Sequence, residues 1–135
     1  MSIEKELNNL NDIFNLFDDP KDKFVQLMDM GKESKQLSEK EKIDQNKIFG
    51  CTSQAWVIGK PNGDNTFTFK TDSDALIVKG LLTILEKIFN GQSTKEILKI
   101  KSHDILIAIG LDKIITSQRT NGFSNAVIKI QTIVK

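Results

Sequence analysis

The sequence predicts an α+β protein in which a small three-stranded antiparallel sheet is covered by helices. Two patterns lead to this prediction. Near both ends of the chain, apolar residues recur at spacings of three and four, as in amphipathic helices. Between 47 and 70, short apolar runs alternate with glycine and other turn formers, as in strands. The 135 residues fit one domain, and no linker or repeat divides them, so we expect one domain over 1–135.

The N-terminal part is predicted to form two helices. An apolar stripe from Ile3 to Phe17 indicates the first helix. The sequence Asp-Asp-Pro ending at Pro20 ends it and begins the second, since proline suits the first helical position. Gly31 is expected to cap the second helix at its C-terminal end. The charged segment 32–46 predicts a solvent-exposed connection.

The middle of the chain contains the three predicted strands. They are the segments 47–49, 55–59 and 66–70, of which the last alternates between polar and apolar residues. The connection 60–65 contains an Asn-Gly pair, which suits a tight turn because both residues tolerate positive φ. A small antiparallel sheet follows from this pattern.

The rest of the chain is predicted to be helical. The helix that begins near Ser73 is apolar nearly all round, which indicates a central, buried helix. Ser93 and Glu96 form a capping-box pattern for a short helix. An apolar segment over 105–109 and an amphipathic stripe over 123–134 complete the set. The prediction is therefore a sheet covered by helices.

Composition excludes several classes of function. Nineteen basic and eighteen acidic residues leave a net charge of +1, which provides no footprint for nucleic acid or an anionic membrane. No stretch approaches the roughly 20 apolar residues of a membrane span. The first ten residues have no apolar core of a secretory signal, so we expect a cytoplasmic protein. One cysteine and one histidine exclude an internal disulfide and make a metal centre unexpected.

Common catalytic motifs are also missing from the sequence. It contains neither a P-loop nor a GxGxxG motif for binding phosphate. Ser102, His103 and Asp104 are the residue types of a catalytic triad, but adjacent side chains point in different directions and cannot form a relay. We therefore expect a surface or packing role for His103, and solvated faces for the scattered acidic residues.

Cys51 has the setting in which a thiol could be reactive. It follows Gly50, which permits a bend that projects the thiol from the end of the sheet. The hydroxyls of Thr52 and Ser53 and the amide of Gln54 could stabilise a thiolate, the reactive form. A lone cysteine can equally be a small buried hydrophobe. The residues by themselves leave both interpretations open.

Three motifs follow one another along the chain. They are GCTSQAW at 50–56, DSDALIVKGL at 72–81 and SQRTNGF at 117–123. They resemble, in this order, the motifs G-C-x-S-x-x-W, D-S-D-A-x-I-V-K-G-L and S/P-x-R-x-N-G-L of the SufE/CsdE family of sulfur acceptor proteins. With compatible spacing, the resemblance covers nearly the whole chain.

The resemblance implies a fold, a function and partners. The fold would be SufE-like, related in shape to iron–sulfur scaffold proteins. The protein would activate a PLP-dependent cysteine desulfurase of the SufS or CsdA type by taking persulfide sulfur onto Cys51. It would then pass the sulfur to an iron–sulfur scaffold complex of the SufBCD type. PLP belongs to the desulfurase, so this chain would need no cofactor and would act as an accessory sulfurtransferase rather than a stand-alone enzyme.

The resemblance also suggests roles for other matched residues. Gly50 and Ser53 would shape the cysteine loop, and Trp56 is expected in the core rather than as a wall for the thiol. Asp74 is expected to cap the central helix. Arg119 is the only arginine, and we expect it to pair with Asp74 or to place positive charge near the thiol. Two further loop residues are assigned as supporting or partner-binding: Thr52 and Gln54.

Two expectations concern the state of the thiol. In the free protein, Cys51 is expected to turn inward against Trp56 or the central helix, which would raise its pKa. Two other functions stay open. The protein could be a non-catalytic regulator of a desulfurase with an inert, buried thiol. It could instead be an independent thiol enzyme, although no motif positions a histidine or a second cysteine for that purpose.

Overall fold

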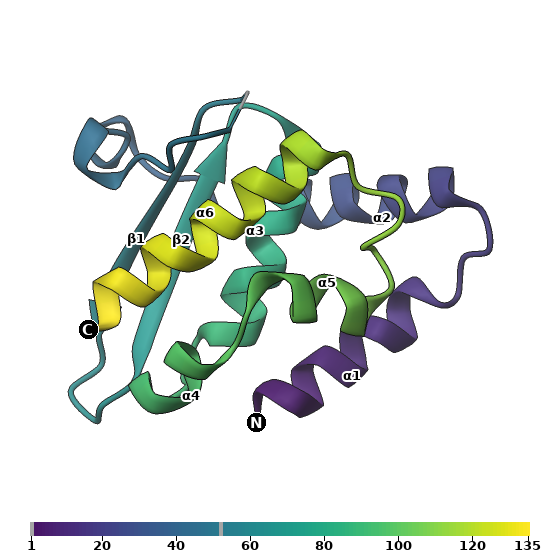
Figure 1. The fold of residues 1–135 in the computed structure, drawn as a ribbon. Helices are drawn as coiled ribbons and strands as arrows, with labels where there is room; N and C mark the ends of the chain where they lie inside the picture. Colours follow the sequence, from purple (N-terminus) through teal and green to yellow (C-terminus); the bar gives the residue numbers. More distant parts are fainter. Residues whose placement is uncertain (1, 52) are drawn as a thin grey trace.

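The computed structural model describes residues 2–51 and 53–135, and these form a mixed α+β fold, as predicted (Figure 1). Two helices precede an antiparallel β-hairpin, and four helices follow it. The elements are α1 (Ile3–Phe14), α2 (Pro20–Glu33), the short 3-10 helices η1 (Glu39–Glu41) and η2 (Asp44–Asn46), β1 (Ala55–Pro61), β2 (Phe67–Ser73), α3 (Leu76–Phe89), α4 (Thr94–Lys99), α5 (Ser102–Ile109) and α6 (Ser117–Val134).

The sheet has two strands in the described residues, so the third predicted strand is not confirmed. β1 and β2 pair antiparallel along their whole lengths. The segment 47–49, predicted as a strand, forms only an isolated bridge between Lys47 and Trp56. The physical reason is a turn at Gly50, where φ is +87° and the chain leaves the strand direction.

Different parts of the chain pack against the two faces of the hairpin. Trp56 and Asp72 lie opposite each other on adjacent strands, and the connection 32–46 packs over them. The Leu37 N–H donates to the Asp72 carboxylate at 3.0 Å. Lys42 places its Nζ 5.5 Å from the centre of the Trp56 ring and 3.4 Å from the Asp72 carboxylate. The prediction was a solvent-exposed connection. The structure differs, because Leu37 within this connection is buried.

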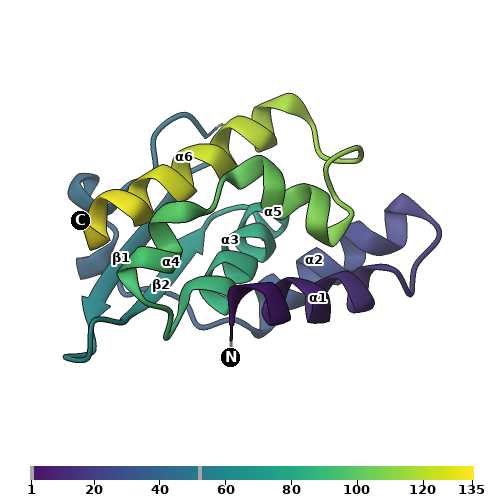
Figure 2. The ribbon, with the colours of Figure 1, turned by 60° about the horizontal axis from the view of Figure 1, so that its bottom comes forward.

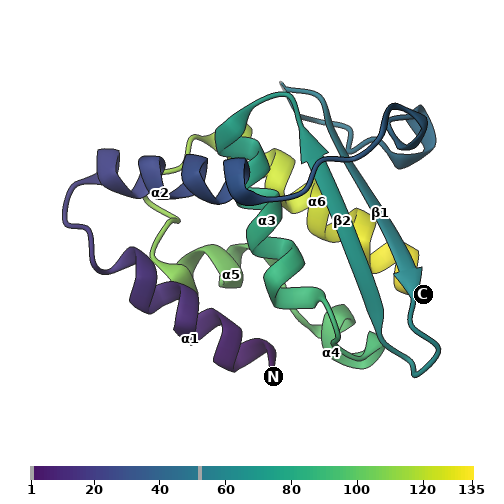
Figure 3. The ribbon, with the colours of Figure 1, turned by 180° about the vertical axis from the view of Figure 1, so that it is seen from behind.

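The helices lie mainly on the other side of the hairpin. In Figure 1, α6 runs along β1, and the view from behind in Figure 3 shows α3 beside β2. Figure 2 shows α1 and α5 on the side of α3 away from the strands. Most residues of α3 are buried, which confirms the prediction of a central helix. No helix in the described part of the chain is long and apolar enough to cross a bilayer.

Helices α2 and α3 cross with their backbones in contact (Figure 3). A Cβ added to Gly80 would lie 2.1 Å from the Leu27 carbonyl oxygen, and one added to Gly31 would lie 2.8 Å from the Leu76 carbonyl oxygen. The prediction that Gly31 caps α2 is wrong, because the helix continues to Glu33. Glycine is required there because it allows close packing between helices rather than because it ends one.

A buried lysine connects β2 to α3. Lys79 is buried, and its Nζ donates to the carbonyl oxygen of Thr71 and lies 3.6 Å from the Glu86 carboxylate. Burial lowers the pKa of Lys79, while the charges of Glu86 and Asp72 oppose that shift. These contacts fix the end of β2 against the start of α3, next to the cysteine loop.

Candidate functional site: a thiol pocket between α3 and α6

The thiol of Cys51 rests against a glycine of α6. Cys51 lies between Gly50 and the start of β1 and is half-buried. A Cβ added to Gly122 would come within 2.7 Å of the Cys51 Sγ. The missing side chain at Gly122 therefore provides the space that the sulfur occupies. This glycine belongs to the third sequence motif, at 117–123.

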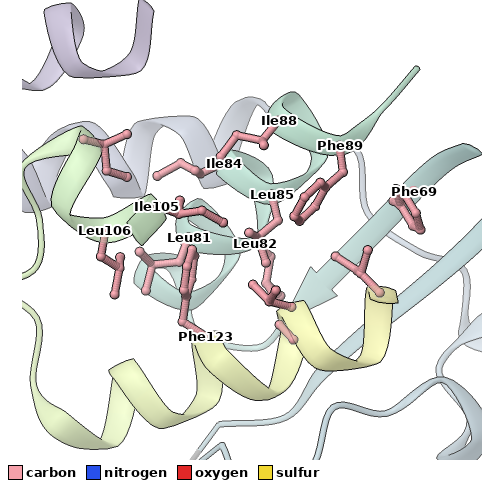
Figure 4. Packing of buried hydrophobic residues seen from close by; sticks show 14 of the residues in the cluster. Phe69, Leu81, Leu82, Ile84, Leu85, Ile88, Phe89, Ile105, Leu106 and Phe123 are labelled. Carbon is pink, nitrogen blue, oxygen red and sulfur yellow. The ribbon is translucent and has the colours of Figure 1, made fainter. Parts of the chain in front are cut away.

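Cys51 lines a largely apolar pocket of about 20 Å³ between α3 and α6. The other lining residues come from these two helices: Val78, Leu81, Leu82, Gln118, Arg119, Gly122 and Phe123. Figure 4 shows Leu81 and Leu82 of α3 close to Phe123 of α6. Such a volume has room for about one water-sized atom beside the thiol.

The lining of the pocket is apolar apart from Gln118 and one basic residue, Arg119. Burial raises the pKa of the Cys51 thiol, so the thiol is mainly protonated at neutral pH. Arg119 contributes to the wall from the first turn of α6, where its backbone N–H donates to the Thr116 Oγ1 at 3.3 Å. A helix N-terminus favours negative charge, as does a guanidinium. The pocket therefore favours the neutral thiol by burial, and Arg119 is the one charged residue among those that line it.

Hydrogen bonds fix the downstream end of the cysteine loop at Gln54. The Gln54 carbonyl accepts from the Ser73 Oγ at 2.7 Å and from the Asp74 N–H at 3.2 Å. The Gln54 N–H donates to the Asp74 carboxylate at 3.1 Å. The prediction that Asp74 caps α3 is therefore wrong. Ala75 is the N-cap residue and has no polar side chain to cap the helix, while the Asp74 carboxylate accepts from the Gln54 N–H of the loop.

A second anchor, which the sequence analysis missed, fixes the upstream end. The side-chain amide of Asn125 donates to the Phe49 carbonyl at 2.9 Å. A Cβ added to Gly50 would lie 2.1 Å from the Asn125 Nδ2, and φ is +87° there, so both space and backbone conformation require glycine. The helical spacing of three residues from Gly122 to Asn125 places both on one face of α6. That spacing was the signal available in the sequence.

The structure brings together only some of the predicted residues. Arg119 lines the same pocket as Cys51, whereas no ion pair joins it to Asp74 within residues 2–51 and 53–135. Trp56 is buried beneath the connection on the outer face of the hairpin and does not line the pocket. Ser53 is half-buried in the loop, and Thr52 lies outside the described residues. Cys51 therefore lies against the central helix α3, as one of the two expectations had it, and not against Trp56.

The described residues offer no metal centre. Over 2–51 and 53–135, no three His, Cys, Asp or Glu side chains gather closely enough to hold a metal ion. His103, on α5, is exposed. The chemistry that this part of the chain can provide at the pocket is therefore that of one thiol, in a pocket that Arg119 also lines.

The fold and the pocket define a class: a small α+β protein whose single thiol lies on a loop before the hairpin and enters a pocket between two helices. The SufE model, described as an Fe-S metabolism associated domain, matches residues 8–134. The chain therefore belongs to the SufE family and is associated with Fe-S metabolism.

Named relatives agree with this membership. The chain is 33% identical to an uncharacterized SufE-like protein of Rhizobium etli, over 96% of this chain and 89% of the relative. It is 34% identical to an uncharacterized SufE-like protein of Rhizobium meliloti, over 93% of this chain and 92% of the relative. The fold matches the solution structure of a hypothetical protein from Thermus thermophilus with a TM-score of 0.76 and 16% identity, over 96% and 93% of the two chains.

Proposed function

We propose that this protein takes persulfide sulfur from a PLP-dependent cysteine desulfurase onto Cys51 and passes it on for iron–sulfur cluster assembly. The observation that carries the proposal is the placement of the chain's only thiol in a protected pocket beside its only arginine, on a loop held by hydrogen bonds. Family membership supports the link to Fe-S metabolism.

The chemical step is a transfer of one sulfur atom between two thiols. The Cys51 thiolate attacks the outer sulfur of the persulfide Cys–S–SH on the desulfurase. A new S–S bond forms at Cys51 while the S–S bond on the desulfurase breaks. The desulfurase cysteine leaves as a thiolate, and the transferred sulfur keeps its proton or releases it to solvent. No external oxidant or reductant is needed, because one persulfide replaces another.

The pocket suits a persulfide once it has formed. Its volume of about 20 Å³ has room for about one atom of the size of sulfur beside the Cys51 thiol. A persulfide is more acidic than a thiol, so its outer sulfur is an anion, and Arg119, which lines the pocket, is the residue that we expect to stabilise it. Enclosure by α3 and α6 would then shield this sulfur from oxidants and from other thiols.

Reactivity in this proposal is controlled by the loop. A half-buried thiol with a raised pKa reacts slowly until a partner draws it out. The anchors at Phe49 and Gln54 are hydrogen bonds, each of which typically stabilises by about 1 kcal/mol. A protein partner can therefore displace the loop at a cost that binding readily offsets.

The proposal assigns PLP to the desulfurase and no cofactor to this chain. Its partners are a desulfurase of the SufS or CsdA type as donor and a scaffold complex of the SufBCD type as acceptor. We place the reaction in the cytoplasm, where thiols are kept reduced. The protein acts in it as a sulfur carrier and activator.

Mass spectrometry and a serine variant test the proposal together. The wild-type protein, mixed with a SufS-type desulfurase and free cysteine, should gain one sulfur atom on Cys51 and stimulate sulfide release. Cys51→Ser should do neither while keeping the wild-type melting temperature, because serine is nearly isosteric but cannot form a persulfide. Stimulation by Cys51→Ser equal to that of the wild type would instead support the alternative, a regulator with an inert thiol.

A further inference from the structure

Two large apolar side chains are exposed beside the cysteine loop. Phe49, two residues before Cys51, is 64% exposed, and Ile128 on α6 is 56% exposed. The Lys47 Nζ lies 5.9 Å from the centre of the Phe49 ring. Phe49 thus presents an aromatic surface to solvent next to the reactive sulfur, where burial of apolar area would be favourable.

A groove of about 330 Å³ lies between this part of the chain and α6. Its principal lining residues come from both sides: Lys47, Phe49, Gly50, Asn125, Ile128 and Lys129. Lys47 and Lys129 bring positive charge, and none of these residues is acidic. The groove therefore combines exposed apolar side chains with two lysines, which complements an aliphatic side chain flanked by carboxylates.

We propose that this groove is the docking site for the cysteine desulfurase, which would insert an aliphatic side chain flanked by acidic residues. The inference rests on the proposed function and deepens it by assigning a surface to the donor. Phe49 and Ile128 supply the apolar contact, and Lys47 and Lys129 supply the charge. Exposed aromatic anchors of this kind provide much of the binding energy in protein interfaces.

The position of the groove explains why the donor is its occupant. The groove contains Phe49 and Asn125, the two residues that make the upstream anchor of the loop. A protein seated there contacts that hydrogen bond directly and competes for the Asn125 amide. Burial raises the pKa of the Cys51 thiol, so the partner that must first draw this thiol out of its pocket is the one that gives it sulfur. Docking in the groove and release of the loop are therefore one event.

Paired variants separate this surface from general effects on the protein. Phe49→Gln and Ile128→Gln remove the apolar contact at exposed positions. Ile107→Gln, on α5, and Leu16→Gln are matched controls, since these residues are 51% and 79% exposed. The connection that holds Leu16, between α1 and α2, lies far from the start of β1 (Figures 1 and 3).

Binding is measured by calorimetry with a SufS-type desulfurase, with every variant placed in a Cys51→Ser background. Phe49→Gln and Ile128→Gln should each raise the dissociation constant by about tenfold, and the two controls by less than about twofold. Lys47→Glu should weaken binding and flatten its dependence on salt. With Cys51 present, saturating amounts of Phe49→Gln should restore the wild-type rate of sulfur transfer.

Unchanged affinity of Phe49→Gln and Ile128→Gln for the desulfurase would overturn the inference. So would a loss confined to binding of the scaffold complex, or a wild-type dimer in sedimentation that Phe49→Gln makes monomeric. The inference can fail while Cys51 still accepts sulfur, and then only the docking surface is wrong. If the groove variants weaken binding but Cys51 gains no sulfur, the docking surface stands and the proposed function fails.

Discussion

Two glycine contacts in this protein look alike and differ in what fills the space. At Gly80, the missing side chain is replaced by the backbone of α2, with the Leu27 carbonyl oxygen 2.1 Å from an added Cβ. At Gly122, it is replaced by the Sγ of Cys51, at 2.7 Å. A helix backbone cannot move away without separating two helices, whereas the end of a side chain on a loop can. The first contact therefore holds the fold together, and the second holds a group that can leave.

The first variant to test this comparison is Gly80→Ala. Its methyl group would overlap the backbone of α2, and relief requires the α2–α3 crossing to open. We expect a loss of at least about 3 kcal/mol in the free energy of unfolding. Urea denaturation followed by circular dichroism measures it. A variant as stable as the wild type would show that the crossing is not rigid.

Gly122→Ala should have the opposite effect: little change in stability but a more reactive thiol. The added methyl group displaces the Cys51 Sγ, while alanine favours the helical conformation of α6, so stability should change by less than about 1 kcal/mol. The displaced thiol loses the burial that raises its pKa. A lower thiol pKa means more thiolate at neutral pH, so alkylation should be faster than in the wild type. Iodoacetamide kinetics followed by mass spectrometry test this, and slow alkylation would contradict a displaceable thiol.

Asn125→Ala sharpens the comparison at the upstream anchor. Loss of the hydrogen bond to the Phe49 carbonyl should lower the free energy of unfolding by about 1 kcal/mol. Alkylation of Cys51 should become faster, but less so than in Gly122→Ala, because the thiol keeps its pocket. Ser124→Ala on the same helix is the control. Alkylation and denaturation of the two variants are compared directly. Equal rates for Asn125→Ala and the wild type would mean that the anchor does not restrain the loop.

The smallest effect expected is in the pH dependence. Burial raises the pKa of Cys51 in the folded protein, so the alkylation rate should continue to rise with pH above the ordinary range for a thiol. The stability that a buried neutral thiol contributes is present below the unfolded pKa and is lost as pH rises through the folded pKa. In Gly122→Ala, the rate profile should move to lower pH. Coincident profiles for the two proteins would contradict the effect of burial.

The sequence predicted the parts of the fold that depend on local pattern. Helix α3 was recognised because its apolar residues extend nearly all round it. The predicted strand at 47–49 failed because two apolar residues after a lysine do not reveal that the chain turns at Gly50 before a ladder can extend. Gly31 was misassigned because the local sequence around a glycine does not show whether it ends a helix or lies where two helices cross. Here it lies at the crossing with α3.

The candidate site was predictable to a similar extent. The motifs identified Cys51, and they also contain Arg119, which the structure places in the same pocket. Asp74 was given the wrong hydrogen-bond partner, since an aspartate before a helix can accept either from that helix or from a loop that the fold brings near. Asn125 lies outside the motifs, and its partner is 76 residues away in the chain. Contacts of that range depend on the tertiary fold.

The position of Trp56 gives the protein a built-in spectroscopic reporter. The chain has one tryptophan and no tyrosine, so near-ultraviolet fluorescence excited at the indole comes from this residue. Its ring lies under Lys42 and the 32–46 connection, on the outer face of the hairpin, and takes no part in the thiol pocket. Its emission should therefore follow detachment of the connection and global unfolding. Loading of sulfur on Cys51 should leave the emission maximum unchanged, which makes it an independent check that a loaded protein is still folded.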